Sequence, residues 1–320
     1  MDEEPGDLNK GDCRFGDGDS GLAIIAAMKT SQSHFVDIRG LRYHIRSWGR
    51  DGAPKLFMLH GWMDVSASFQ FLVDELEGDW QIFAPDWRGY GLTGPTGADC
   101  YWFPDYFVDL DRILDRFEPD RPATLIGHSM GGHIAGLYSG IRPERVARFV
   151  NLEGFGMADT DPARAPERYR KWLDEMRAPE GFRDYADFDE LAQRLMKNNP
   201  RLSAARAAFL APHWGRVNAS GRVELLSDPA HKIVNPVLYR AQETFACWRN
   251  ITAQVFWVQA ANTKSLDFLK LDMTAIEERK AMFRHLRSVT IPDAGHMVHH
   301  DQPEMLAREI ENFLKSCPVA

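Results

Sequence analysis

The stretch ATLIGHSMGGHIAGLYSGI (123–141) decides the fold of this chain. Residues 123–127 form a short apolar run of the kind that makes a buried strand, and residues 130–141 carry the pattern of a helix. The two segments meet directly at GHSMGG (127–132). The sequence therefore predicts a strand, a sharp turn and a helix, with Ser129 at the turn.

Ser129 stands at the centre of this turn. A sharp strand-to-helix turn strains the backbone of its central residue, so small residues are needed two positions away on each side, and Gly127 and Gly131 meet that need. The turn lifts the Ser129 hydroxyl above the sheet, at the amino end of a helix whose dipole favours developing negative charge. The pattern favours a nucleophilic serine. A glycine-rich turn with an incidental serine is the alternative, because GxSxG also recurs by chance.

Strand-like and helix-like segments alternate on both sides of this turn. Two strands with period-2 patterning flank the Arg39-Gly40 turn in residues 34–49. Further strands are expected at 55–61, 80–89, 146–154, 254–260 and 287–295, and further helices at 66–78, 106–119, 273–285 and 303–316. This alternation predicts an α/β protein whose mostly parallel sheet carries helices on both faces.

The alternation is interrupted at residues 155–250. This segment is too long for a loop in a compact domain, and it contains candidate helices at 168–177 and 188–199. We expect it to form a helical cap over the carboxyl edge of the sheet. The core would then consist of residues 31–154 and 251–320.

Residues 1–30 are expected to be an N-terminal extension. Because residues 1–20 carry only Leu8 and Phe15 as large apolar side chains, they bury too little surface to be ordered. The apolar run at 21–28 follows acidic residues, which argues against a signal peptide, and Met28 is an alternative start.

Composition excludes several function classes. The 320 residues carry 38 Lys and Arg against 46 Asp and Glu, a net charge of −8, which argues against nucleic-acid and anionic-membrane partners. No stretch approaches the roughly 20 apolar residues that span a bilayer. The four cysteines show no CxxC pair and no disulfide framework, which favours a reducing compartment and the cytoplasm. Nothing in the sequence indicates an oligomeric state.

Two further segments supply groups that an activated serine needs. His60-Gly61-Trp62 follows the strand at 55–61, and the N–H groups of Trp62 and Met130 would form an oxyanion hole, with Met63 the less favoured donor. The segment DAGH (293–296) ends a strand, so His296 would reach over the sheet to take the proton from Ser129.

The sequence favours neither a metal nor a cofactor. His296, His299 and His300 form an HxxHH pattern, but no acidic or cysteine ligand pattern accompanies it. His299 and His300 are therefore expected to be surface or helix-start residues. GDGDSG (16–21) lacks the preceding strand that a phosphate loop requires.

These motifs together resemble the α/β-hydrolase superfamily. The resemblance rests on HGW (60–62), DWRGYG (86–91), GHSMGG (127–132) and the late Gly295-His296 before a helix, and it covers residues 34–316. It implies an eight-stranded-type sheet with an inserted cap. It also implies that Asp86, Arg88 and Gly89 belong to a structural turn of the superfamily and serve the scaffold, not catalysis.

The acid of the expected triad departs from the commonest pattern of the superfamily. Residues 259–263, after the seventh strand, contain no carboxylate, and Asp267 lies further on. A smaller set of relatives places the acid after the sixth strand, where Glu153 stands here. A buried carboxylate needs a partner, which a histidine supplies. We favour Glu153, with Asp267 as the alternative acid and a structural role for Glu153 as the remaining possibility.

The simplest function for these residues is that of a serine hydrolase that cleaves a small, largely apolar ester, lactone or related carbonyl compound through an acyl-enzyme. Trp62, Phe155, Trp214 and Met297 are the expected substrate-binding residues. A serine at position 129 argues against dehalogenase and epoxide-hydrolase chemistry, which needs a carboxylate there. The alternative implied by the resemblance is a cofactor-free dioxygenase that works through a His–acid dyad, and a binding protein without activity is the third class.

Overall fold

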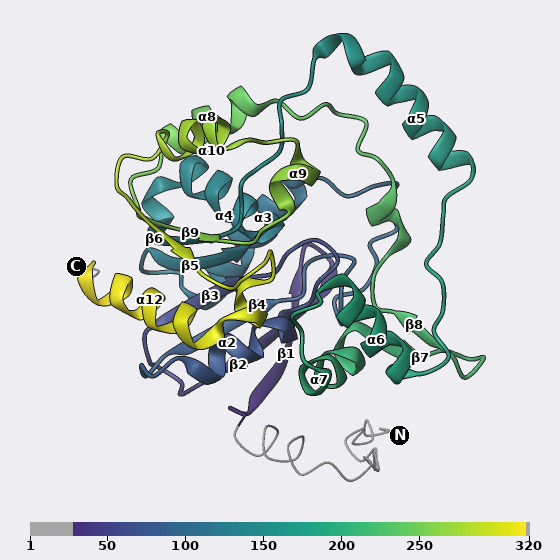
Figure 1. Ribbon diagram of the computed structural model, residues 1–320, viewed down its shortest axis with the longest axis horizontal. Helices are drawn as coiled ribbons and strands as arrows, with labels where there is room; N and C mark the ends of the chain where they lie inside the picture. The colour runs from purple at the N-terminus through teal and green to yellow at the C-terminus, as the bar shows by residue number, and fades with distance from the viewer. Residues whose placement is uncertain (1–27, 318–320) are drawn as a thin grey trace.

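An eight-stranded sheet runs through the protein (Figure 1). The computed structural model describes residues 28–317, so the expectations about residues 1–27 lie outside the described residues. The strand order is β1-β2-β4-β3-β5-β6-β9-β10, with β2 antiparallel to both of its neighbours and every other neighbouring pair parallel. The strands are β1 (Ser31–Ile38), β2 (Leu41–Trp48), β3 (Lys55–Leu59), β4 (Gln81–Pro85), β5 (Ala123–His128), β6 (Val146–Leu152), β9 (Gln254–Ala260) and β10 (Leu286–Ile291).

Helices cover both faces of this sheet, as the alternation predicts (Figure 1). Leu125 and Ile126 of β5 are consecutive and belong to opposite faces, each packed in its own apolar cluster. One face is covered by α2 (Gln70–Glu75) and α12 (Pro303–Ser316). The other is covered by α3 (Phe103–Phe117), α4 (Met130–Ile141), α8 (Ala241–Arg249) and α10 (Met273–Lys280). The short helices α9 (Ser265–Leu269) and α11 (Val298–Asp301) lie in the loops after β9 and β10.

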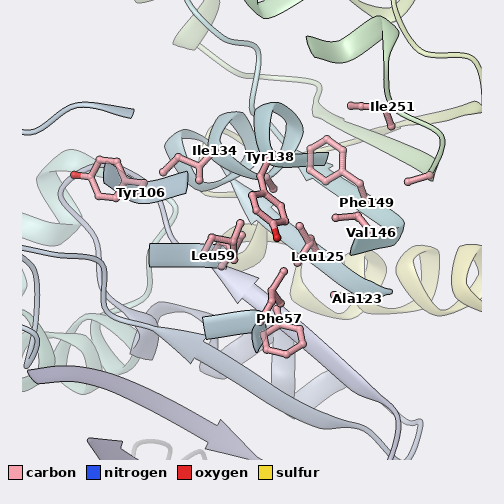
Figure 2. Close-up of a cluster of buried hydrophobic side chains, with 14 of the residues drawn as sticks. Phe57, Leu59, Tyr106, Ala123, Leu125, Ile134, Tyr138, Val146, Phe149 and Ile251 are labelled. Carbon is pink, nitrogen blue, oxygen red and sulfur yellow. The ribbon is translucent and has the colours of Figure 1, made fainter. Parts of the chain in front are cut away.

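The apolar cluster beneath α4 fixes the helix that follows Ser129. Figure 2 shows Phe57, Leu125 and Phe149, which come from three neighbouring strands, gathered with Ile134 and Tyr138 of α4. All five side chains are buried, and burying each is worth about 1.5–3 kcal/mol. The position of α4, and with it the turn at its amino end, is therefore set by packing against the centre of the sheet.

The segment after β4 is structural. The Asp86 carboxylate accepts hydrogen bonds from the Ser66 and Leu92 N–H groups at 2.7 and 2.9 Å, and it contacts His44 Nδ1 at 2.7 Å. Arg88 forms a bidentate ion pair with the buried Asp109 carboxylate, with one contact at 2.5 Å and the other at 2.7 Å. These partners end β4 at Pro85, earlier than the strand expected over 80–89.

The segment between β6 and β9 forms most of a small apolar cluster, which also includes Phe71 of α2. Besides α8 it contains α5 (Ala165–Arg177), α6 (Phe188–Asn198), α7 (Ala204–Trp214) and a two-stranded hairpin of β7 (Gly215–Val217) and β8 (Val223–Leu225). Side chains of α6, α7 and β8 pack together in this cluster, among them Leu191, Leu195, Leu210 and Val223. The two expected helices are present, whereas α7, α8 and the hairpin were not foreseen.

Helix α5 differs from its neighbours. Every residue of α5 is exposed or half-buried, and the helix stands apart from the rest of the protein in Figure 1. Arg168 Nε donates to the Asn235 carbonyl at 2.7 Å, and the Glu175 carboxylate accepts from the Val234 N–H at 2.6 Å. Polar contacts therefore tether α5 to the chain at residues 234–235.

Two general expectations about the chain can be compared with the described residues. Within residues 28–317, none of the helices has the length and apolar character needed to cross a membrane. In the same range, Cys100, Cys247 and Cys317 are unpaired.

Candidate active site

Ser129 occupies a strained turn between β5 and α4. Its φ of 50° and ψ of −114° are unusual for a residue with a side chain. A Cβ on Gly127 would lie 2.5 Å from the Gly131 carbonyl oxygen, and a Cβ on Gly131 would lie 2.1 Å from the Leu59 carbonyl oxygen. Only glycine fits at these two positions, so the glycine spacing read from the sequence is the steric condition for the turn.

His296 reaches the Ser129 hydroxyl from the loop that follows β10. Its Nε2 lies 2.9 Å from Ser129 Oγ. The loop is held in two places: the Gly295 N–H donates to Asp301 Oδ2 at 2.7 Å, and His128 Nε2 contacts the His296 carbonyl oxygen at 2.9 Å. Because the carbonyl is only an acceptor, His128 must carry its proton on Nε2 there. The imidazole of His296 is thus placed to take the hydroxyl proton.

Glu153 contacts the other nitrogen of the same imidazole. Its Oε2 lies 3.3 Å from His296 Nδ1, and its Oε1 accepts a hydrogen bond from the Ala260 N–H at 2.7 Å. The Glu153 side chain is fully buried, so these two contacts compensate a carboxylate that has lost its water. Asp267, the alternative acid, is exposed on α9. The structure therefore brings Ser129, His296 and Glu153 together in one continuous row of contacts.

The backbone at Glu153 is also unusual. Glu153 has a φ of 58°, and its N–H donates to the Val258 carbonyl at 3.1 Å. The next residue, Gly154, exchanges two hydrogen bonds with the Asn151 side chain, at 3.0 and 3.1 Å. The carboxylate is therefore fixed by the end of the sheet itself.

The two expected oxyanion donors lie beside the serine turn. A Cβ on Gly61 would be 3.3 Å from Ser129 Cβ, so the chain after β3 passes directly against the nucleophile and carries Trp62 with it. Met130 begins α4, where backbone N–H groups have no acceptor inside the helix. His60 supports this loop: its Nε2 accepts from the Trp87 N–H at 2.9 Å, and its Nδ1 contacts the Gly61 carbonyl at 2.8 Å. Burial lowers the pKa of His60 to about 4, so it stays neutral at pH 7.

The expected substrate-binding residues lie in different surroundings. The Trp62 side chain is 55% exposed, and Met297, next to His296, is half-buried. Phe155 is buried in the core against Trp257, and its carbonyl accepts from Arg279 Nε at 2.9 Å. Trp214 lines a cavity of about 10 Å³ at the end of α7, together with Met63 and Tyr90. Of these four residues, Trp62 and Met297 directly follow residues that touch Ser129: Trp62 follows Gly61, which lies against Ser129, and Met297 follows His296, which contacts it.

The histidines near the site are more deeply buried than expected. His299 and His300 lie in α11 and are 0% and 2% exposed, so the expectation of surface residues is wrong, although both do begin a helix. Packing of α11 against α2 and the 3₁₀ helix η1 (Ser66–Phe69) explains this, because Phe69 and Phe71 contact the two rings. Burial lowers the pKa of His300 to about 3 and that of His299 well below its usual value.

Several functional contacts carry no clear signal in the sequence. His128 stands inside the GHSMGG motif, but its contact with the His296 carbonyl depends on a loop far along the chain. Asp301, which holds Gly295, also accepts a hydrogen bond from Asn199 Nδ2 at 2.8 Å. Asp64 lies buried behind the serine turn, where burial raises the pKa of its carboxyl to about 7. The position of His128 directly before the nucleophile is the one signal that was available.

With the geometry described, the chain can be compared with known proteins. The family model for the alpha/beta hydrolase fold matches residues 54–303. This chain belongs to that family. The match includes β3 to β10 and every catalytic candidate named above.

Individual relatives agree with this family. A serine hydrolase-like protein of Danio rerio is 28% identical over 275 residues, which cover 84% of this chain and 83% of the relative. Epoxide hydrolase 4 of Homo sapiens is 33% identical over 112 residues, or 35% of this chain and 31% of the relative. Among solved structures, the thioesterase domain from the curacin biosynthetic pathway has a TM-score of 0.80 at 21% identity, covering 88% of this chain and 99% of that domain. The named relatives support a hydrolase of this fold.

Proposed function

We propose that this member of the alpha/beta hydrolase family is a serine hydrolase. Its substrate would be a small, largely apolar ester, lactone or related carbonyl compound. The observation that carries the proposal is the continuous contact from Ser129 Oγ to His296 Nε2 at 2.9 Å and from His296 Nδ1 to Glu153 Oε2 at 3.3 Å. This is the arrangement that acyl transfer by a serine requires.

In the proposed mechanism Ser129 Oγ attacks the substrate carbonyl carbon while His296 Nε2 takes the hydroxyl proton. Glu153 holds the imidazole through Nδ1 and stabilises the imidazolium that forms. The Trp62 and Met130 N–H groups donate to the oxyanion of the tetrahedral intermediate. His296 then protonates the leaving group, which departs and leaves the acyl-enzyme. In the second half, His296 takes a proton from a water that attacks the acyl carbon, and it returns the proton to Ser129 Oγ as the acid product leaves.

The residue at position 129 also limits the chemistry. Epoxide opening on this fold uses a carboxylate nucleophile, and position 129 carries a hydroxyl. The relative named as an epoxide hydrolase aligns with about a third of this chain. We therefore propose acyl transfer on a small-molecule substrate. The net charge of −8 argues against nucleic-acid and anionic-membrane partners, and the cysteine usage favours the cytoplasm.

The apolar character of the proposed substrate rests on the groups beside the site. Trp62 offers an exposed indole directly after the Gly61 contact with Ser129, and Met297 follows His296. Both side chains are apolar, and each directly follows a residue that lies against Ser129. A substrate with a small apolar acyl or alcohol group would cover these two side chains.

The experiment that tests the proposal is labelling with a fluorophosphonate, followed by intact mass measurement. Folded wild type should gain one adduct per chain, and the Ser129→Ala variant and heat-unfolded wild type should gain none. Folded wild type that remains unlabelled would overturn the serine mechanism. In that event, oxygen consumption with heteroaromatic substrates by both wild type and Ser129→Ala would identify the dioxygenase alternative, because a His–acid dyad works without the serine.

A further inference from the structure

Three buried side chains meet behind the serine turn. Asp64 follows the loop that carries Trp62, His128 ends β5, and His299 lies in α11. Each is at most 2% exposed. One ligand atom from each side chain lies within 4.8 Å of the other two, and Asp64 Oδ2 is 4.0 Å from His299 Nε2.

Several polar atoms of these three side chains lack partners. Within residues 28–317, Asp64 Oδ2, His128 Nδ1 and both ring nitrogens of His299 are buried without a hydrogen bond. Buried polar atoms in this condition are rare, and one such atom on each of three neighbouring side chains points to a bound group that contacts all three. The trio therefore brings a carboxylate oxygen and imidazole nitrogens together away from water.

The remaining polar atoms of Asp64 and His128 are already engaged and orient the free ones. Asp64 Oδ1 accepts from the Val65 N–H at 2.8 Å and from the Ser68 hydroxyl. His128 Nε2 donates to the His296 carbonyl at 2.9 Å, which leaves Nδ1 as an unprotonated acceptor. Contacts of this kind, in which a backbone carbonyl or a hydroxyl fixes a ligand from behind, are typical around metal ligands.

We propose that Asp64, His128 and His299 form a binding site for one transition-metal ion of the Zn²⁺ class. Two imidazoles and one carboxylate are ligands that Zn²⁺ and its neighbours prefer, whereas Mg²⁺ and Ca²⁺ require more oxygen atoms. Bonds of about 2.0–2.2 Å to zinc place ligand atoms roughly 3.3–3.6 Å apart. Asp64 Oδ2 and His299 Nε2 are 4.0 Å apart, so a small rotation of these side chains toward each other reaches that spacing. A water completes the coordination.

The ion would enter through the loop over the trio. Gly61, without a side chain, lies against His128 Nδ1, since a Cβ there would be 2.9 Å from that atom. Met63 has a φ of 54°, so the residues between Gly61 and Asp64 are held in a strained conformation that movement would relieve. This short loop is the opening that the proposal requires.

A bound ion also has a consequence for the neighbouring serine. Drawing Asp64 and His128 together shifts the loop that carries Trp62 and the ring that holds the His296 carbonyl. We therefore expect the ion to slow hydrolysis. This consequence rests on the proposed function, whereas binding of the ion does not.

Cobalt binding tests the site without any need for activity. The full chain is freed of metal with a chelator and titrated with Co²⁺, whose visible absorption reports four- or five-coordinate binding through nitrogen and oxygen. One Co²⁺ per chain is expected, displaced by one equivalent of Zn²⁺. Ser129→Ala should bind it unchanged, so failure of the serine mechanism and failure of the metal site are distinguishable.

Matched variants assign the ligands. Asp64→Asn keeps the shape of the side chain, and His299→Phe fills the same space beside Phe69; each should weaken Co²⁺ binding at least tenfold. The control is His133→Gln, because His133 is also buried with both ring nitrogens unpartnered among the described residues but lies outside the trio. Circular dichroism checks that each variant is folded.

Two results would overturn the proposal. If wild type shows no stoichiometric visible bands, a water and not a metal satisfies the trio. If the bands persist at full strength in both folded ligand variants, the ion binds elsewhere, on exposed histidines.

Discussion

The sheet and the segment inserted after β6 are built differently. The residues proposed for chemistry stand at the ends of β5, β6 and β10, two of them at positive φ, and all rest on clusters that span the sheet. The inserted segment packs in a smaller cluster that it shares with Phe71 of α2, and its helix α5 buries no residue fully. Strained positions need surroundings that fix them, so the reactive groups belong to the part with the larger core.

Polar contacts join the two parts at the loop that carries His296. Asn199, at the end of α6, donates to Asp301 Oδ1, while Asp301 Oδ2 accepts from the Gly295 N–H. Arg206 of α7 donates to the His300 carbonyl. The inserted segment thus contacts the loop of His296 through the side chains of Asn199 and Arg206.

The largest effect should follow from a change in the sheet part. Glu153→Gln removes the charge that stabilises the imidazolium, and kcat for a p-nitrophenyl ester should fall about 10³- to 10⁴-fold, by analogy with loss of the acid in a serine triad. The melting temperature should change little because glutamine keeps the shape. Asp267→Asn, on exposed α9, is the control and should retain wild-type kcat. A large loss in Asp267→Asn together with an active Glu153→Gln would assign the acid to Asp267.

The next prediction concerns how the free energy of unfolding depends on pH through His133, which lies in the core behind Ser129. His133 of α4 is buried among Phe103, Tyr239 and Trp248, and burial, aided by the nearby Arg279 charge, lowers its pKa from 6.5 to about 3. Below pH 6.5 the unfolded chain therefore takes up a proton that the folded chain refuses. The contribution of His133 to the free energy of unfolding is therefore fully present above pH 6.5, and it is lost as the pH falls toward 3.

Replacing His133 by a residue that does not titrate should remove this pH-dependent loss of stability. Between pH 7 and pH 5 the free energy of unfolding of wild type should fall by about 2 kcal/mol more than that of His133→Phe, as measured by urea unfolding at both values. His285→Gln, at an exposed position, should keep the wild-type difference. Equal pH dependence in His133→Phe and wild type would show that His133 titrates normally.

A smaller effect is expected where the two parts meet. Asn199→Ala removes the hydrogen bond to Asp301, and kcat/KM should fall about fivefold, the equivalent of about 1 kcal/mol, through a less fixed His296 loop. The pH profile of kcat should shift as well, which loss of stability alone would not cause. The adjacent, exposed Asn198→Ala is the control. Identical kinetics for both variants would mean that the inserted segment does not influence the base.

The smallest effect belongs to α5. Leu173 is 50% exposed, so Leu173→Ala should change the free energy of unfolding by less than about 0.5 kcal/mol. Leu210→Ala, in the cluster of α6 and α7, should instead cost about 2–4 kcal/mol. Urea unfolding measures both. A loss in Leu173→Ala as large as that in Leu210→Ala would show that α5 packs against the protein in solution.

The sequence predicts those features that depend on neighbouring residues. The β5–α4 turn has a local steric pattern, so Ser129 could be found, and the strand before Glu153 placed that carboxylate at the edge of the sheet. Helix α7 escaped prediction because Pro212 stands inside it, and the strands of the β7–β8 hairpin are only three residues long, too short to show a period. The trio of Asp64, His128 and His299 could not be foreseen, because its members come from three segments that meet only in the folded chain.

The exit from β6 has a consequence for exchanging parts between proteins of this family. Asn151 and Gly154 close a small loop around Glu153, and a Cβ on Gly154 would lie 2.3 Å from Asn151 Oδ1. A chimera that receives a foreign inserted segment should therefore be joined after Gly154 and returned before β9. A junction placed earlier would replace the backbone that holds the Glu153 carboxylate, and the hybrid would lose the contact between Glu153 and His296.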